Sequence, residues 1–194
     1  MKVLVFDTEA TDIEPGQICQ LSYIVDDGGA LAADNLFFAV DSMSEGSQEV
    51  HGMSIGQLAE LSGGRTFADR AQELFEVFSR ADLLVGHNVA FDDRYIRVEF
   101  ERAGLKLPKI RTFCTMNFFT PLMSLKRKVQ TGRPKPPKLG ELVEYYGVTQ
   151  EEIQQKCDEL FAGGEAAHDA RFDTVATWLC MRRASEKGDL RGIF

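Results

Sequence analysis

The sequence predicts an α/β fold: a mixed five-stranded sheet, three antiparallel strands followed by parallel strands, flanked by helices. Three strand-like segments come first, at residues 2–6, 17–27 and 30–40. After residue 65, strand-like and helical segments alternate. This order of elements suggests one sheet with helices packed on it. We expect a single domain over residues 1–194, because this length suits one hydrophobic core.

The three early strands are recognised by apolar content and by a turn signal. Residues 2–6 are apolar on both faces, which is typical of a central strand. Asp27, Gly28 and Gly29 separate the next two segments and indicate a hairpin turn. The second and third strands are therefore expected to be antiparallel neighbours.

The later elements are predicted from start signals, stop signals and apolar spacing. Ser54 and Gln57 form a capping box for a short helix, and Thr149 with Glu152 forms another. Gly104 is suited to end a helix. The predicted elements are helices over 53–61 and 66–81, a strand within 82–88 that ends at Gly86, a helix over 89–104, a strand over 109–115, a helical region after it, and helices over 138–148, from 149 and over 169–187.

Composition excludes several classes of protein. Hydrophobic residues make up 44% and charged residues 27%, and no apolar run approaches the ~20 residues of a membrane span. A net charge of −8 argues against a general nucleic-acid coat protein. The beginning of the chain lacks a signal-peptide pattern, and the four cysteines are scattered. We expect a cytoplasmic protein with reduced thiols and no membrane partner.

One segment is basic despite the acidic total. Between residues 125 and 140 there are six cations and no acidic side chain: Lys126, Arg127, Lys128, Arg133, Lys135 and Lys138. By itself, a solvated proline-rich loop explains this segment equally well.

Asp7 and Glu9 follow the first apolar run directly. Side chains alternate along a strand, so these two carboxylates share one face and Thr8 takes the other. Carboxylates this close raise each other's pKa unless a positive charge lies between them. Mg²⁺ and Mn²⁺ prefer such oxygen ligands. The pair favours a divalent metal site, although a solvated acidic pair at a strand end is the simpler alternative.

A second acidic position follows the strand at 82–88. Asn88 is placed to cap the next helix, and Asp92 falls in its first turns. A carboxylate at a helix N-terminus is also stabilising without any ligand. We interpret His87 as structural.

The last motif pairs a histidine with an aspartate. His168 precedes Asp173 by five residues, and on an ideal helix their side chains would diverge by roughly 140°. They can serve one site only if His168 lies before the helix, and Asp169 as N-cap would put it there. A loop histidine beside a metal site could accept a proton from water.

These motifs together resemble those of a known family. "FDTEAT" at 6–11, "HNVAFD" at 87–92 and "HDARFD" at 168–173 are similar to the three motifs of the DEDDh-family, DnaQ-like 3′–5′ exonucleases of the ribonuclease-H-like superfamily. "HGM" at 51–53 resembles the family's segment near the terminal nucleotide. The resemblance runs in order from residue 3 to about residue 180.

The resemblance implies a site and a reaction. Two Mg²⁺ or Mn²⁺ ions would be held by Asp7, Glu9, Asp92 and Asp173, and His168 would deprotonate the attacking water. The partner would be a nucleic acid with a free 3′-OH, single-stranded DNA or RNA, and the product a nucleoside 5′-monophosphate. Eleven residues are expected at the substrate: Ala10, Thr11, His51, Gly52, Met53, Asn88, Lys126, Arg127, Lys128, Arg133 and Lys135.

The sequence departs from the family pattern after Glu9. Ala10 replaces a common threonine, and Asp12 stands where glycine is common. A hydroxyl contact to the substrate is then missing, and the entrance is more negative. This affects the expected substrate preference and leaves the metal chemistry unchanged.

Several functions remain open at this point. The chain could be a proofreading subunit with a polymerase partner, or an RNA exonuclease similar to ribonuclease T or oligoribonuclease. It could also be an inactive nucleic-acid-binding module. A ribonuclease-H-type endonuclease is disfavoured by the spacing of His168. The oligomeric state is undetermined.

Overall fold

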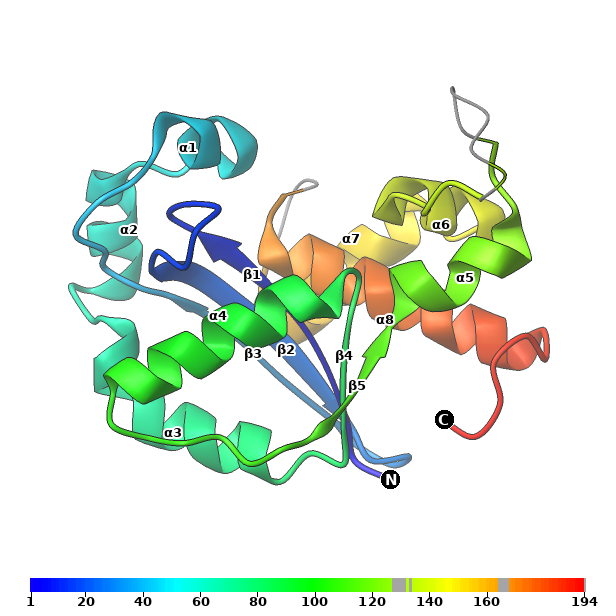
Figure 1. The fold of residues 1–194 in the computed structure, drawn as a ribbon, viewed down its shortest axis with the longest axis horizontal. Helices are drawn as coiled ribbons and strands as arrows, with labels where there is room; N and C mark the ends of the chain where they lie inside the picture. The colour runs from blue at the N-terminus through cyan, green and yellow to red at the C-terminus, as the bar shows by residue number, and fades with distance from the viewer. Residues whose placement is uncertain (127–131, 133, 164–167, 194) are drawn as a thin grey trace.

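A computed structural model describes residues 1–126, 132, 134–163 and 168–193. Its sheet has five strands in the order β3-β2-β1-β4-β5 (Figure 1). The first two pairs, β1–β2 and β2–β3, are antiparallel, whereas β1–β4 and β4–β5 are parallel. This confirms the predicted fold class. The strands are β1 (Val3–Ala10), β2 (Ile18–Asp26), β3 (Leu31–Phe37), β4 (Leu83–Gly86) and β5 (Arg111–Cys114).

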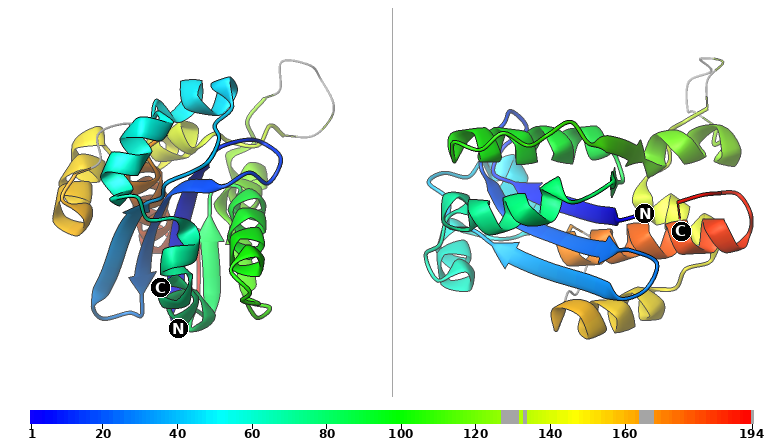
Figure 2. Two further views of the ribbon diagram at one scale, coloured as in Figure 1. Left: turned by 90° about the vertical axis from the view of Figure 1, so that its left-hand side faces the viewer. Right: turned by 90° about the horizontal axis from the view of Figure 1, so that it is seen from below.

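Helices cover both faces of the sheet. Figure 2 shows α3 and α4 on one side of the strands and α7 and α8 on the other. The helices are α1 (Glu45–His51), α2 (Ile55–Ser62), α3 (Phe67–Ser79), α4 (Val89–Arg102), α5 (Thr115–Met123), α6 (Leu139–Tyr146), α7 (Gln150–Phe161) and α8 (Ala170–Glu186). The sequence analysis missed α1, which follows Ser44 as N-cap and buries none of its residues, so it has no apolar stripe to recognise.

Strand β1 is longer than the sequence analysis proposed. It continues through Asp7 and Glu9 to Ala10, where a register shift interrupts the pairing with β2. The backbone of Asp7 pairs with Ser22, and that of Glu9 with Gln20. Polar side chains do not prevent ladder formation, because the ladder uses main-chain groups. Both acids therefore sit on a regular strand instead of beyond its end.

The alternation along β1 decides which layer each side chain meets. Val3 and Val5 belong to the core under α8, whereas Leu4 and Phe6 belong to the core under α3 and α4. Asp7 and Glu9 continue the first series, so they share one face as predicted, and that face is the one covered by α8. Thr8 continues the second series and faces α4.

Several helix ends lie where capping residues in the sequence predicted them. The capping boxes at Ser54 and Thr149 are both formed, and Gly104 has a φ of 76° after α4. Asp169 is the N-cap of α8, with its side chain accepting the Arg171 N–H. These predictions are confirmed because they rest on contacts between residues close in sequence.

Two further findings bear on the compositional expectations. In the described part of the chain, every helix is too short or too polar to span a bilayer. The four cysteines are free thiols, and Cys19, Cys157 and Cys180 are buried.

Candidate active site

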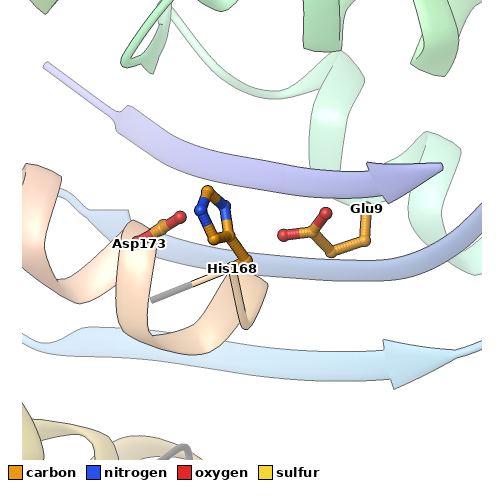
Figure 3. A group of neighbouring side chains, drawn as sticks. All are labelled: Glu9, His168 and Asp173. Carbon is orange, nitrogen blue, oxygen red and sulfur yellow. The ribbon is translucent and has the colours of Figure 1, made fainter. Parts of the chain in front are cut away.

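The centre of the site is formed by β1 and the beginning of α8. Ligand atoms of Glu9, His168 and Asp173 all lie within 4.8 Å of one another. Figure 3 shows the imidazole of His168 between the two carboxylates. Glu9 is buried, Asp173 is partly buried and His168 is exposed. The predicted convergence of the first and last motifs is therefore present in the structure.

His168 lies before α8, as the helical-phase argument required. Its φ is 67°, a left-handed conformation that is uncommon for a residue with a side chain. This conformation directs the imidazole back toward β1 instead of letting it continue the helix. Asp173 then comes from the first turn of α8. One loop residue and one helical residue can thus face the same strand.

Asp92 approaches from the opposite layer. It lies in the first turn of α4 and is only 3% exposed. Its Oδ1 accepts hydrogen bonds from the Thr8 backbone N–H at 3.0 Å and from the Thr8 hydroxyl at 2.7 Å. The sequence analysis gave Thr8 no role. Its position on the α4 face of β1, next to an acid in the first turn of that helix, was the available signal.

Burial and mutual repulsion raise the pKa of every carboxyl group in the cluster. Burial is the largest cause at each group. The pKa of Glu9 rises to about 9, with Asp173 and Asp92 contributing repulsion, and that of Asp7 is raised well above its ordinary value. The pKa of Asp92 rises to about 7, although the Thr8 hydrogen bonds lower it. Burial raises the pKa of Asp173 to about 6, and the nearby His168 keeps it from rising further.

The donor set fits divalent cations. Glu9, His168 and Asp173 offer ligand atoms within 4.8 Å of one another, and Asp7 and Asp92 lie close enough to add to the repulsion within the cluster. A positive charge among these carboxylates would be stabilising. Hard oxygen donors suit Mg²⁺ and Mn²⁺. The residues present therefore fit the metal ions that the sequence motifs imply.

A cavity of about 350 Å³ borders the cluster on the Glu9 side. Two of the expected substrate residues, Ala10 and His51, line it together with Asp12 and Phe91. Its remaining walls come from the loop after β1 and from α1, a helix that the sequence analysis missed: Ile13, Ser44, Gly46, Ser47 and Val50.

Three other expected substrate residues, Thr11, Gly52 and Met53, do not line this cavity. Thr11 is 2% exposed and its hydroxyl accepts the Gln17 N–H at 2.9 Å, so its side chain faces the protein interior. Gly52 is the exposed left-handed C-cap of α1. Met53 packs partly buried against the cluster of Cys19, Val40 and Leu58 instead of lining the cavity. An apolar residue between two helices is readily drawn into the nearest core.

A second cavity, of about 640 Å³, also borders the cluster. Asp7, His168 and Asp173 line it together with Lys135. The Lys135 ammonium is paired with the carboxylate of Glu141. Proline and aliphatic side chains, with Met116 and Phe172, supply an apolar wall. Acidic, basic and apolar groups thus line the same cavity.

The remaining basic residues are only partly described. Lys126 is exposed, and the Lys135 N–H donates to the Leu125 carbonyl oxygen at 2.8 Å. Arg127, Lys128 and Arg133 lie outside the described residues. Two of the five predicted basic contacts can therefore be placed, and only Lys135 lines a cavity of the site.

The segment before α4 combines a cap position with a structural histidine. Asn88 occupies the N-cap position with φ of 74°, but its side chain makes no capping hydrogen bond to the described helix, contrary to the expectation. The ring of His87 contacts the Thr115 hydroxyl through Nδ1 and the Pro137 carbonyl oxygen through Nε2, both at 3.0 Å. The structural interpretation of His87 agrees with these contacts.

Comparison with known proteins places this site in a family. The exonuclease family model (RNase_T) matches residues 4–177. No curated protein matches the sequence. Among solved structures, the fold is similar to exonuclease I. The zinc-bound complex of E. coli exonuclease I with single-stranded DNA has a TM-score of 0.73 at 17% identity, covering 97% of this chain and 41% of that chain.

Other structures of exonuclease I agree. A structure described as suggesting how processivity is achieved has a TM-score of 0.71 at 17% identity, covering 95% of this chain and 41% of that one. The E. coli enzyme with a dA16 oligonucleotide has a TM-score of 0.68 at 18% identity, over 95% and 41%. The chain thus spans about two fifths of the length of these proteins. With its motifs in order and its fold matched, the chain belongs to the exonuclease family, as a DEDDh-type, DnaQ-like member of the ribonuclease-H-like superfamily.

Proposed function

We propose that the protein is a 3′–5′ exonuclease that releases nucleoside 5′-monophosphates from single-stranded or frayed 3′ ends. The observation that carries this proposal is the cluster of Glu9, His168 and Asp173, whose ligand atoms lie within 4.8 Å of one another. Two cavities border the cluster, one at Glu9 and one at Asp7, His168 and Asp173, and they offer space for the end of a nucleic-acid chain.

Four carboxylates would hold the metal ions: Asp7, Glu9, Asp92 and Asp173. Two Mg²⁺ or Mn²⁺ ions, when bound, supply the positive charge that stabilises the scissile phosphate as its negative charge grows. Thr8 keeps Asp92 in a fixed orientation by two hydrogen bonds to Oδ1. This support would limit how far the Asp92 carboxylate can turn.

His168 is the proposed general base. One of its ring nitrogens takes the proton of the attacking water, and Glu9 and Asp173 on either side stabilise the resulting imidazolium. The side chain is exposed, so it can pass that proton to solvent after each turnover. The water oxygen forms the new bond to phosphorus, and the 3′-oxygen of the preceding nucleotide leaves.

Substrate contacts follow from the two cavities. The first, lined by Ala10, His51 and Phe91, would take the terminal nucleoside. The second, lined by Lys135, would take the adjoining backbone, and the basic segment 126–135 would hold phosphates further along. Apolar and aromatic walls suit unstacked bases, which favours a single-stranded end.

Single-stranded DNA is the substrate we favour. The exonuclease I structures of similar fold include complexes with single-stranded DNA. A polymerase partner finds no support in those structures. RNA remains the alternative, and contacts to the 2′-OH would decide between them.

The test uses a labelled single-stranded oligonucleotide with a free 3′-OH and its matched 3′-phosphate control. We expect stepwise release of 5′-monophosphates from the first, loss of that release in EDTA, and no release from the second. Parallel reactions with a mismatched DNA duplex and a short RNA would rank the substrates. Internal cleavage, or release unaffected by EDTA, would refute the proposal.

A further inference from the structure

The sheet face beneath α8 carries polar side chains that the proposed reaction does not use. In the strand register, Asp7 lies opposite Ser22 and Glu9 opposite Gln20. Ser22 in turn lies opposite Asn35 on β3. Side chains of directly opposite residues project from the same face of a sheet. Gln20 and Ser22 therefore flank the two β1 carboxylates on the face that α8 covers.

Gln20 is fully buried and uses its amide group completely. Its Nε2 donates to Asn35 Oδ1 and to Asp169 Oδ1, each at 2.9 Å. Its Oε1 accepts the backbone N–H of Ala170 at 3.2 Å. A fully satisfied buried amide fixes the groups around it, because any displacement leaves polar atoms unpaired. Gln20 thus joins β2 and β3 to the first residues of α8.

Asp169, which accepts the hydrogen bond from Gln20, is itself held in place by further contacts. Its carboxylate also accepts from the Arg171 backbone N–H at 3.0 Å and from the Arg171 guanidinium. Burial would raise the pKa of Asp169, but the hydrogen bonds from Arg171 and Gln20 outweigh it and hold the pKa below its ordinary value. The carbonyl oxygen of Asp169 accepts the Asp173 N–H at 3.1 Å. The position of Asp169 therefore affects that of Asp173.

Two other hydrogen bonds tie α8 to β2. The Thr174 hydroxyl donates to the Ser22 carbonyl oxygen at 3.3 Å, and the Trp178 Nε1–H donates to Asp26 Oδ2 at 3.1 Å. Residues 170, 174 and 178 recur every four positions, so the ties lie along one face of the helix. The Gln20 tie is at the end of α8 that carries His168 and Asp173. The Trp178 tie lies further along the helix and offers a matched control.

We infer that Gln20 is a positioning residue: it holds the first turn of α8, with Asp173 and His168, in register with Glu9 on β1. The inference rests on the proposed function and adds a residue that touches neither substrate nor metal. Groups that orient metal-binding side chains typically change metal affinity or activity by about 10- to 100-fold when they are replaced.

The test compares Gln20→Met, which keeps the length of the side chain without its polar atoms, with Trp178→Phe. We expect Gln20→Met to lower kcat by about 10- to 100-fold and to weaken Mn²⁺ affinity measured by calorimetry, with KM little changed. Trp178→Phe should lower the thermal midpoint but keep kcat and Mn²⁺ affinity at wild-type values. If Gln20→Met does not fold, Gln20→Asn serves instead, since its amide is one methylene too short to reach α8.

The outcomes separate this inference from the proposed function. Wild-type protein without nuclease activity or Mn²⁺ binding would remove the proposed function itself. An active wild type, combined with wild-type Mn²⁺ affinity and kcat in the folded Gln20 variant, would overturn the positioning role. Equal losses in the Gln20 and Trp178 variants would also overturn it, because they would show a general effect of loosening α8.

Discussion

The carboxyl group of Asp7 lies in the field of four other acidic side chains. Burial is the main reason why its pKa is raised, and repulsion from Asp92, Asp173, Glu9 and Asp169 adds to it. In the proposed site three of these repelling groups, Asp92, Asp173 and Glu9, are ligands of the cations. Function and stability of the metal-free protein therefore oppose each other at this residue.

Asp7→Asn is the residue-scale test of that opposition. Removing one charge should relieve repulsion and raise the thermal midpoint of the metal-free protein in EDTA. The same change should abolish cleavage and weaken Mn²⁺ binding, because an amide is a poorer ligand than a carboxylate. Calorimetry measures the thermal midpoint and the Mn²⁺ binding. The control is Asp12→Asn, which alters an exposed acid lining the neighbouring cavity and should leave Mn²⁺ stoichiometry intact. Unchanged stoichiometry in Asp7→Asn would remove Asp7 from the ligand set.

His168→Ala tests the proton-transfer role. A placed general base is typically worth ~10²–10⁴-fold in rate, so kcat should fall by about that factor. Metal binding should persist, because the four carboxylates remain. A variant with wild-type kcat would show that another group takes the proton.

At the scale of elements, the segment between α5 and α6 brings cations to the site. The Lys135 N–H donates to the Leu125 carbonyl oxygen and so joins the two ends of the basic segment. Lys126 and Lys135 are therefore close in space. His87 holds the Pro137 carbonyl oxygen and so anchors the following turn at the end of β4. A strand-end histidine and a backbone hydrogen bond thus fix the two ends of the segment that carries these charges.

The paired variant Lys126→Gln/Lys135→Gln tests this arrangement. Each phosphate contact contributes ~0.7 to the salt slope for single strands, so the slope of log KM against log salt should flatten by up to about 1.4. KM should rise more than kcat falls. Adding Arg127→Gln, Lys128→Gln and Arg133→Gln should extend both effects. The matched control is Lys106→Gln/Lys109→Gln, which removes two exposed cations before β5, at the opposite end of that strand from the site. An unchanged slope in the paired variant would show that the segment is a solvated loop that does not hold substrate phosphates.

At the scale of the molecule, the carboxylate cluster links stability to pH. The folded-state pKa values are raised, to about 6 for Asp173, about 7 for Asp92 and about 9 for Glu9. A raised folded pKa contributes stability that is complete below the unfolded pKa and is lost as pH rises through the folded pKa. The metal-free protein should therefore lose stability between about pH 4 and 9.

Thermal scans in EDTA at about pH 5.5 and about pH 8.5 measure this loss. The midpoint should be lower at the higher pH, and excess Mg²⁺ should raise it more there than at the lower pH, because ionised carboxylates bind cations. We also expect one cooperative transition, since the chain is proposed to be one domain over residues 1–194. A flat pH response in EDTA, or two separate transitions, would contradict these expectations.

Much of this molecule follows from chemistry between neighbours in the chain. The capping boxes at Ser54 and Thr149, the turn at Gly104 and the placement of His168 before α8 each depend on residues a few positions apart. The alternation of β1 likewise puts Asp7 and Glu9 on one face wherever the strand lies. Sequence patterns of this range predicted the five strands and the hairpin turn between the second and the third.

The tertiary structure decided which distant groups meet. Thr8 supports Asp92 across 84 residues, and Gln20 reaches Asp169 across 149, because sheet register and helix packing bring them together. The same packing buried the Thr11 side chain, drew Met53 partly buried against a core cluster, and built one cavity wall from α1, which has no apolar stripe. The sequence by itself determined the chemical groups of the site and the strand or helix that carries each one. Their mutual distances depended on how three layers pack, since hydrophobic burial acts between surfaces far apart along the chain.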